Sequence, residues 1–141
     1  MYILVVVETD CYCTSLRAAT RKLAARYDAA LLPVGVNVAQ WGLLRKLDPS
    51  GLVPVSIQEL AERAELERST VARNIRVLEK MNLVRMGESD TDRRTSTIRL
   101  TDAGRSVLDR GLPLWQGAQL QVEEMLGRQR AVDFRSLLLS L

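Results

Sequence analysis

The stretch Glu67–Lys80, ERSTVARNIRVLEK, decides the fold of this chain. At roughly 100° of turn per residue, its apolar side chains fall on one side of a helix and its basic side chains on the other. An exposed stripe of arginines suits a helix in the major groove of DNA, because guanidinium groups pair with guanine edges and with phosphates. The same pattern also fits an ordinary amphipathic helix with a solvated face, so the neighbouring segments decide the interpretation. The apolar side holds Val71, Ile75 and Leu78, and the basic side holds Ser69, Arg73, Arg76 and Lys80.

A short helix is predicted directly before this stretch. The sequence SIQE at 56–59 fits a capping box, in which the hydroxyl of Ser56 accepts from the amide of Glu59 and the carboxylate of Glu59 returns to the amide of Ser56. This helix is expected to end near Ala64, and the tight connection 64–66 leads into the next one. Two helices joined in this way have helix-turn-helix spacing.

A β-hairpin is predicted directly after the stretch. Strands are expected at 83–86 and 95–100, and Asn82 is expected in the left-handed conformation that ends the preceding helix. The turn between the strands carries Arg93 and Arg94, and arginines at a hairpin tip suit the narrow minor groove of A·T tracts. The alternative for this turn is a solvated loop with internal salt bridges. A helix-turn-helix followed by a hairpin is a winged helix.

Longer helices are predicted on both sides of this unit. Thr9 or Asp10 is expected to cap the first of them, and Pro113 should kink or split the third. The terminal helices carry more apolar surface than one small winged helix can cover, so burial against a second copy is expected. The four predicted helices cover residues 10–32, 37–47, 102–126 and 128–141.

Composition argues against several classes of protein. The chain of 141 residues is 47% hydrophobic, which is enough for one domain with a real core. It has no histidine and only two cysteines, so we expect no enzyme, no metal site and no cofactor. The low cysteine count and the lack of a long apolar segment indicate a cytoplasmic protein. The net charge of +3 is only a weak indication of a polyanionic partner.

Residues 56–104 resemble the MarR family of bacterial transcription regulators. The wing signature followed by Leu-Thr-x-x-Gly is specific to that family, and the flanking helices match its layout. Asn82 stands where the family often has glycine, which is a mild departure. The segments that carry the resemblance are SIQELA at 56–61, STV at 69–71, LEKMNLV at 78–84, DRR at 92–94 and LTDAG at 100–104.

The resemblance implies a mainly α fold with a small β-hairpin (α+β) in a single domain over 1–141. A winged helix-turn-helix DNA-binding region would cover 37–100, and dimerisation helices would cover 10–32 and 102–141. It implies an obligate homodimer on a pseudo-palindromic operator in double-stranded DNA, acting as a repressor released by a small phenolic or other amphipathic ligand. The predicted DNA contacts are Ser69, Thr70, Arg73, Asn74, Arg76 and Lys80 on the helix and Arg93 and Arg94 on the wing.

Two alternative functions remain open on the residues alone. Cys11 and Cys13 stand at the start of the first helix, where the helix N-terminus lowers thiol pKa values, so the chain could be a thiol-based redox-sensing regulator. Both cysteines could instead be small buried residues in a dimer interface. A winged helix can also be a protein-interaction module, in which the basic stripe meets an acidic partner.

An effector pocket is expected between the dimerisation helices and the winged helix. Its candidate lining residues are Tyr12, Arg17, Tyr27 and Trp41. The alternative for Trp41 is a plain core position, because a tryptophan at an apolar helical position is usually buried for packing.

Overall fold

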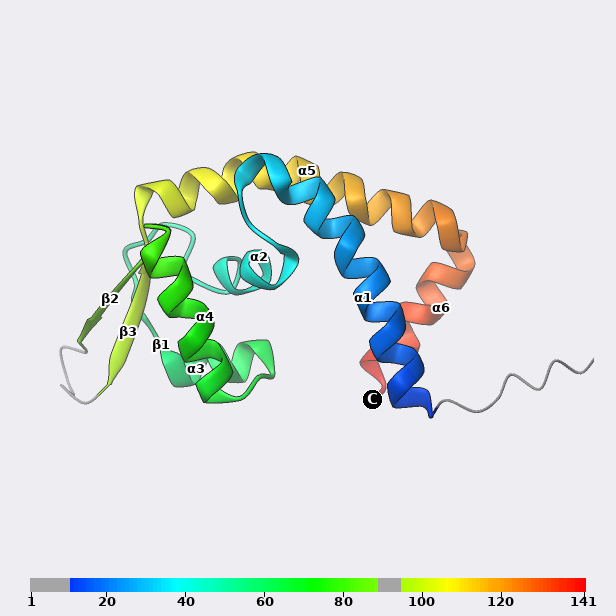
Figure 1. Ribbon diagram of the computed structural model, residues 1–141, viewed down its shortest axis with the longest axis horizontal. Helices are drawn as coiled ribbons and strands as arrows, with labels where there is room; N and C mark the ends of the chain where they lie inside the picture. The colour runs from blue at the N-terminus through cyan, green and yellow to red at the C-terminus, as the bar shows by residue number, and fades with distance from the viewer. Residues whose placement is uncertain (1–10, 89–94) are drawn as a thin grey trace, which may run out of the picture.

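The computed structural model describes residues 11–88 and 95–141. In Figure 1, α2–α4 and the sheet lie at one end, α1 and α6 lie at the other, and α5 spans both. The expected mainly α fold with a small β-hairpin is confirmed. No helix in these two ranges has the length and apolar character needed to cross a membrane. The elements are α1 (Tyr12–Leu31), the short 3-10 helix η1 (Leu32–Val34), α2 (Val38–Leu44), β1 (Val55–Ser56), α3 (Ile57–Ala64), α4 (Arg68–Lys80), β2 (Val84–Glu88), β3 (Ser96–Leu100), α5 (Asp102–Leu126) and α6 (Arg128–Leu139).

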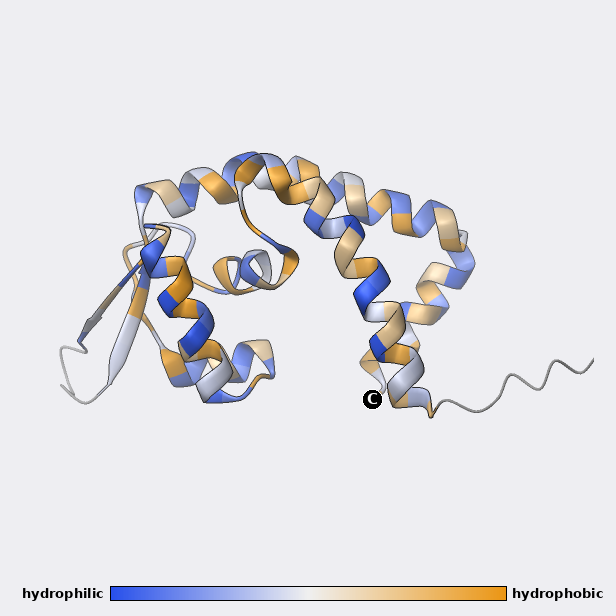
Figure 2. Ribbon diagram, in the orientation of Figure 1, coloured by the Kyte–Doolittle hydropathy of each residue, from blue (hydrophilic) through white to orange (hydrophobic). Residues whose placement is uncertain are grey.

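The core of the winged part lies between α3, α4 and the sheet. Val71, Ile75 and Leu78 of α4 are fully buried, as the periodicity predicted. Each such side chain contributes about 1.5–3 kcal/mol relative to an exposed position. Figure 2 shows the resulting alternation of apolar and polar bands along α4. The buried face of α4 therefore fixes which of its side chains must face outward.

The sheet has the order β1-β3-β2, with both pairs antiparallel. The predicted hairpin is confirmed in β2 and β3, where Ile98 and Leu100 point inward and are buried. The third strand, β1, has only two residues and lies at an edge of the sheet. Pro54 precedes it and lacks the amide that a longer strand would need.

The start of α3 differs in one detail from the expected capping box. The hydroxyl of Ser56 accepts from the amide of Glu59 at 3.0 Å, as predicted. The carboxylate of Glu59 lies instead 3.6 Å from Arg63, one helical turn further on, and it makes no bond to the Ser56 amide. Glu65 then adopts a left-handed conformation, with φ of 53°, which reverses the chain into α4. Asn82 is left-handed at the other end of α4, as expected.

Helix α5 is unbroken, so of the two outcomes expected at Pro113, a kink or a split, the split is wrong. Pro113 is exposed, and the carbonyl that loses its amide partner can therefore be hydrated while the helix curves gently (Figure 1). Thr101 is the N-cap of this helix, because its hydroxyl accepts from the amide of Gly104 at 3.0 Å. Gly127, with φ of 86°, ends the helix.

Helix α1 begins later than predicted. Its N-cap is Cys11, whose sulfur accepts from the amide of Thr14 at 3.4 Å, so the expectation of a cap at Thr9 or Asp10 is wrong. Both of those residues lie outside the described part of the chain. Helix α2 is also shorter than expected and ends at Leu44, although Leu47 beyond it is still buried.

Candidate DNA-binding surface

Four side chains of α4 form one exposed stripe opposite the buried face. They are Ser69, Arg73, Arg76 and Lys80. Within the described ranges, these four side chains have no hydrogen bond or ion pair, so their donors are free for a ligand. Free guanidinium groups on one helix face are the chemistry that recognises phosphates and guanine edges.

Two further predicted contacts, Thr70 and Asn74, lie at the edge of this stripe. Both residues are half-buried, and the amide nitrogen of Asn74 donates to the carbonyl of Thr70 at 3.0 Å. This bond holds Asn74 along its own helix and leaves its amide oxygen as an acceptor. The two remaining predicted contacts, Arg93 and Arg94, lie outside the described residues, so the structure places only the helix side of the predicted surface.

Two arginines of the hairpin were not predicted as candidate site residues. Arg85 and Arg99 are direct cross-strand partners, and both are exposed. The signal was present in the sequence, because strict alternation puts Arg99 on the face opposite Ile98 and Leu100. Without the register of β2 against β3, however, the sequence did not show that the two arginines face one another.

A cavity of about 280 Å³ lies between α2 and α5, where the effector pocket was expected. Trp41 lines it but is also a core residue, with only 2% of its surface exposed. Its ring lies 6.4 Å from that of Trp115, and the guanidinium of Arg45 stacks 4.3 Å over Trp115. The indole nitrogen of Trp41 is buried without a hydrogen-bond partner in the described ranges. The cavity is lined by Trp41, Arg45, Leu47, Pro49, Leu108, Asp109 and Leu112.

The other three predicted pocket residues do not line this cavity. Tyr12 is 96% exposed at the start of α1, and Arg17 is exposed on the same helix. Tyr27 is half-buried and donates to the side-chain oxygen of Gln119 on α5. Burial raises the pKa of Tyr27, while the charges of Arg135 and Glu123 act on it more weakly and in opposite directions.

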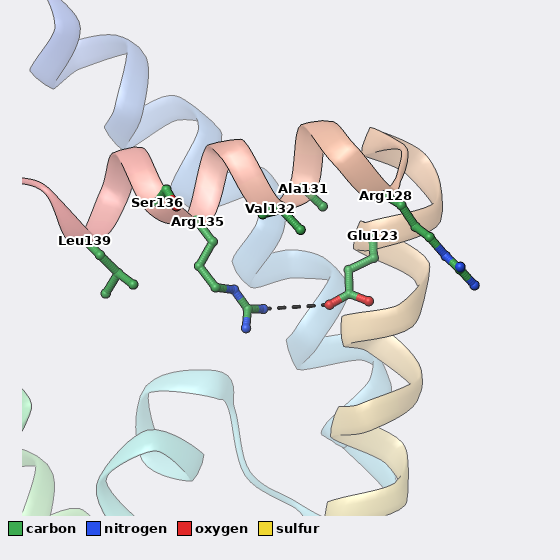
Figure 3. A pocket seen from close by; sticks show the side chains of 7 residues that line it. All are labelled: Glu123, Arg128, Ala131, Val132, Arg135, Ser136 and Leu139. Atoms are coloured by element: carbon green, nitrogen blue, oxygen red, sulfur yellow. Dashed lines mark ion pairs between the residues drawn. The ribbon is translucent and has the colours of Figure 1, made fainter.

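A larger cavity of about 420 Å³ opens at the junction of α5 and α6. Figure 3 shows Arg135 of α6 reaching toward Glu123 of α5, with a separation of 3.7 Å. The apolar wall comes from α6, where Leu139 is 82% exposed. More large apolar side chains are exposed on the last two helices: Leu120, Met125, Val132, Leu137 and Leu138. One copy of the chain therefore leaves a wide apolar surface in water at this end.

The two cysteines are exposed and unpaired. The sulfur of Cys11 lies 3.1 Å from the hydroxyl of Thr14. Hydrogen bonds from the side chain and then from the backbone amide of Thr14 lower the pKa of the Cys11 thiol. Because Cys11 is the N-cap, Cys13 is the second residue of α1. An N-cap at Asp10 would have made Cys13 the third residue.

The helix-turn-helix of α3 and α4, followed by the β2–β3 hairpin, places the chain in the class of winged-helix proteins. A model of the MarR family matches residues 34–95. YhbI, an uncharacterized helix-turn-helix transcriptional regulator of Bacillus subtilis, is 31% identical over 94 residues, which are 67% of this chain and 60% of YhbI. MdtR, a helix-turn-helix transcriptional repressor of the same species, is 30% identical over 123 residues, which are 87% of this chain and 69% of MdtR.

A solved structure gives the same result over nearly the whole chain. The transcriptional regulator MosR of M. tuberculosis, in complex with DNA, is 35% identical and superposes with a TM-score of 0.77. The superposition covers 91% of this chain and 93% of that chain. The chain belongs to the MarR family of transcriptional regulators. Members of this family are DNA-binding winged-helix proteins and not enzymes.

Proposed function

We propose that this protein is a homodimeric repressor that reads a pseudo-palindromic operator in double-stranded DNA. The observation that carries the proposal is the stripe of free donors on α4, opposite a fully buried face. In this proposal α4 enters the major groove, where Arg73 and Arg76 contact base edges or phosphates and Ser69 and Lys80 contact the backbone. Thr70 and Asn74 flank these contacts, and Arg93 and Arg94 enter the minor groove.

The homodimer is proposed from the terminal helices. The exposed apolar side chains of α5 and α6 need a cover, and a second copy supplies one that also places two recognition helices on the same DNA. The chain then works as a single domain, in which 10–32 and 102–141 make the dimer and 37–100 binds DNA. Repression is the function that the name of MdtR gives for that relative, and we propose it for this chain by similarity.

The effector is proposed to be a small amphipathic molecule bound beside Trp41. The cavity there joins α2, in the winged part, to α5, in the dimerisation part, so a ligand in it can change their relative position. The apolar walls suit an aromatic body, and Arg45 suits an acidic group. Binding would change the fluorescence of Trp41 and Trp115 and release DNA. If phenolic acids neither change the tryptophan fluorescence nor release DNA when titrated into the protein, the result would argue against this pocket.

Selection of duplexes from a random pool tests the DNA-binding proposal most directly. We expect an enriched sequence with two inverted half-sites about 10 base pairs apart or a multiple of that spacing. Affinity for it should fall steeply with salt concentration and exceed the affinity for scrambled duplex by about a thousandfold or more. A pool that yields no enriched sequence would instead favour a protein-interaction module, in which the basic stripe meets an acidic protein.

A second candidate function, redox sensing, is favoured by the exposed Cys11 thiol and its lowered pKa. Peroxide would oxidise the Cys11 thiolate to a sulfenic acid with release of hydroxide, and a second thiol would then condense with it to a disulfide with loss of water. We expect peroxide to weaken operator binding by the wild-type protein but not by the Cys11→Ser variant. Serine is the suitable replacement because it keeps an N-cap acceptor and removes the thiol.

The companion variant is Cys13→Ser, which removes the other thiol without touching the cap. It should abolish the response to peroxide if Cys13 is the second thiol, and keep it if Cys11 of a second copy is. Binding assays before and after peroxide, and again after a thiol reductant, give the measurement. If wild-type protein binds the selected duplex equally well before and after peroxide, the redox function is wrong. If the loss of binding survives the replacement of both cysteines, these thiols are not the sensor.

A further inference from the structure

Two arginines of the hairpin, Arg85 and Arg99, have positions that the binding of DNA by α4 does not explain. They are paired across β2 and β3 in the antiparallel register. Their neighbours Val84, Ile98 and Leu100 are buried, so alternation sends both arginine side chains to the outer face of the sheet. Like charges directly opposite each other on one face destabilise a strand pair. The sheet therefore carries an unfavourable pair at this position unless something offsets it.

No acidic side chain in the described part of the chain forms an ion pair with either arginine, although Asp102 lines the same cavity. The nearby carboxylate of Asp102 forms its ion pair with Arg105, and Glu79 accepts from the amide of Met86. Neither the side chain of Arg85 nor that of Arg99 takes part in an ion pair or a hydrogen bond in the described ranges. Two adjacent guanidinium groups, with about ten N–H donors between them, are thus left to an external acceptor.

The two arginines line a cavity of about 290 Å³ at the base of the hairpin. Its other walls are Gly51, Leu100, Thr101 and Asp102. The size is sufficient for a small oxyanion with its hydration water. Because arginine presents a planar fork of donors, two arginines side by side match the several oxygens of a phosphate group better than they match a spherical chloride ion.

The opposite wall of the cavity is held in place by the loop before β1. The carboxylate of Asp48 accepts from the amides of Leu52 and Val53, at 3.1 and 2.8 Å. Arg105 donates to the carbonyl of Ser50 at 2.9 Å and so ties this loop to α5. Gly51, with φ of 72°, lies so close to Leu100 that a Cβ there would be 2.8 Å from the Leu100 carbonyl oxygen. The wall is therefore fixed before any ligand arrives.

We propose that Arg85 and Arg99 bind a phosphate-type oxyanion at the base of the wing. The site lies at the base of the hairpin, where β2 follows α4 and β3 leads into α5 (Figure 1). Glu88 and Ser96 are at the opposite ends of the two strands. The phosphate can belong to a free small molecule or to DNA that flanks the operator. Binding of a DNA phosphate rests on the proposed function, whereas binding of a free small molecule does not.

Thermal unfolding of the full chain tests the free anion. We compare inorganic phosphate with sodium chloride at matched ionic strength, in a zwitterionic buffer and at constant protein concentration. Phosphate should raise the unfolding midpoint of the wild type more than chloride does. Arg85→Gln and Arg99→Gln should each weaken phosphate binding by roughly tenfold or more, because each removes charge-assisted hydrogen bonds. Without phosphate, neither variant should unfold below the wild type, since each relieves the repulsion between the two cations.

Arg110→Gln is the matched control, because Arg110 is exposed on α5 and does not line the cavity. The substitution removes the same charge as the two test variants do. It should respond to phosphate as the wild type does. The second arm measures binding to the selected duplex and to the same duplex extended by about one helical turn, roughly 10 base pairs, at each end. If the phosphate belongs to flanking DNA, the two variants will bind only the longer duplex more weakly, and with a lower salt slope.

The two arms separate the outcomes. Weaker phosphate stabilisation in both variants supports the site with a free anion, and a selective loss on the longer duplex supports it with DNA. Equal effects of phosphate and chloride on the wild type, together with unchanged binding of both duplexes by the variants, would overturn the proposal. If the wild type binds no DNA at all, the proposed function fails, and the free-phosphate arm alone decides the site.

Discussion

Replacing Arg73 with alanine will weaken binding to the selected operator by about 1–3 kcal/mol, which is up to roughly a hundredfold. Arg73 lies in the middle of the exposed stripe of α4, and none of its donors is used inside the described part of the protein. Its removal therefore takes away contacts to DNA without leaving an unpaired partner in the protein. Because the residue is exposed, the free energy of unfolding should stay within about 0.5 kcal/mol of the wild type.

The design separates a base contact from a phosphate contact. Fluorescence anisotropy measures affinity for the selected duplex and for a scrambled duplex at several salt concentrations. Loss on the selected duplex alone indicates a base contact, whereas equal loss on both, with a salt slope lower by about one, indicates a phosphate contact. Arg110→Ala on α5 removes the same charge away from α4 and should bind normally. Wild-type affinity of Arg73→Ala on both duplexes would show that α4 is placed wrongly.

Replacing Gly104 with alanine will destabilise the fold by about 1–3 kcal/mol or more, as overpacking in a closed site does. Gly104 is buried in the first turn of α5, and a methyl group there would overlap the carbonyl oxygen of Leu83. That carbonyl accepts from the amide of Thr101 at 3.1 Å, so the clash also disturbs the bond that joins the residue before β2 to the cap of α5. This contact gives a physical reason for the glycine in the Leu-Thr-x-x-Gly motif.

Gly117→Ala is the control in the same helix. No atom lies within 4 Å of a Cβ at Gly117, so the substitution should leave stability unchanged or raise it by about 0.5–1 kcal/mol, through the higher helix propensity of alanine. Thermal or chemical unfolding of both variants at equal protein concentration gives the comparison. If Gly104→Ala unfolds at the same midpoint as Gly117→Ala, then α5 does not approach Leu83 as closely as the structure shows.

Local signals in the sequence predicted the winged part well. Val71, Ile75 and Leu78 recur at helical spacing, Asn82 marks the end of α4, and Thr101 is a strong capping residue, and each of these features depends on neighbours within one helical turn. The basic stripe followed directly from the same periodicity, because burying one face of a helix exposes the other.

Features that depend on distant contacts were predicted less well. The pairing of Arg85 with Arg99 depends on the register of the hairpin, and a shift of one residue would have separated them. The cavity beside Trp41 depends on how α2 packs against α5, where a Cβ on Gly111 would overlap the indole ring. Pro113 was expected to kink or divide α5, but α5 is undivided, and a proline on the solvent side of a long helix is tolerated because water replaces the lost bond.

In the proposed homodimer, the continuity of α5 has a geometric consequence for how far apart the two copies can hold their α4 helices. A helix of 25 residues is about 37 Å long. A tilt of about 5° at one end therefore displaces the other end by about 3 Å, which is close to the rise of one base pair. With Trp41 packed against Gly111, α2 and this part of α5 should tilt together. A small change in the angle between the terminal helices would thereby move the winged end of the molecule by about the rise of one base pair.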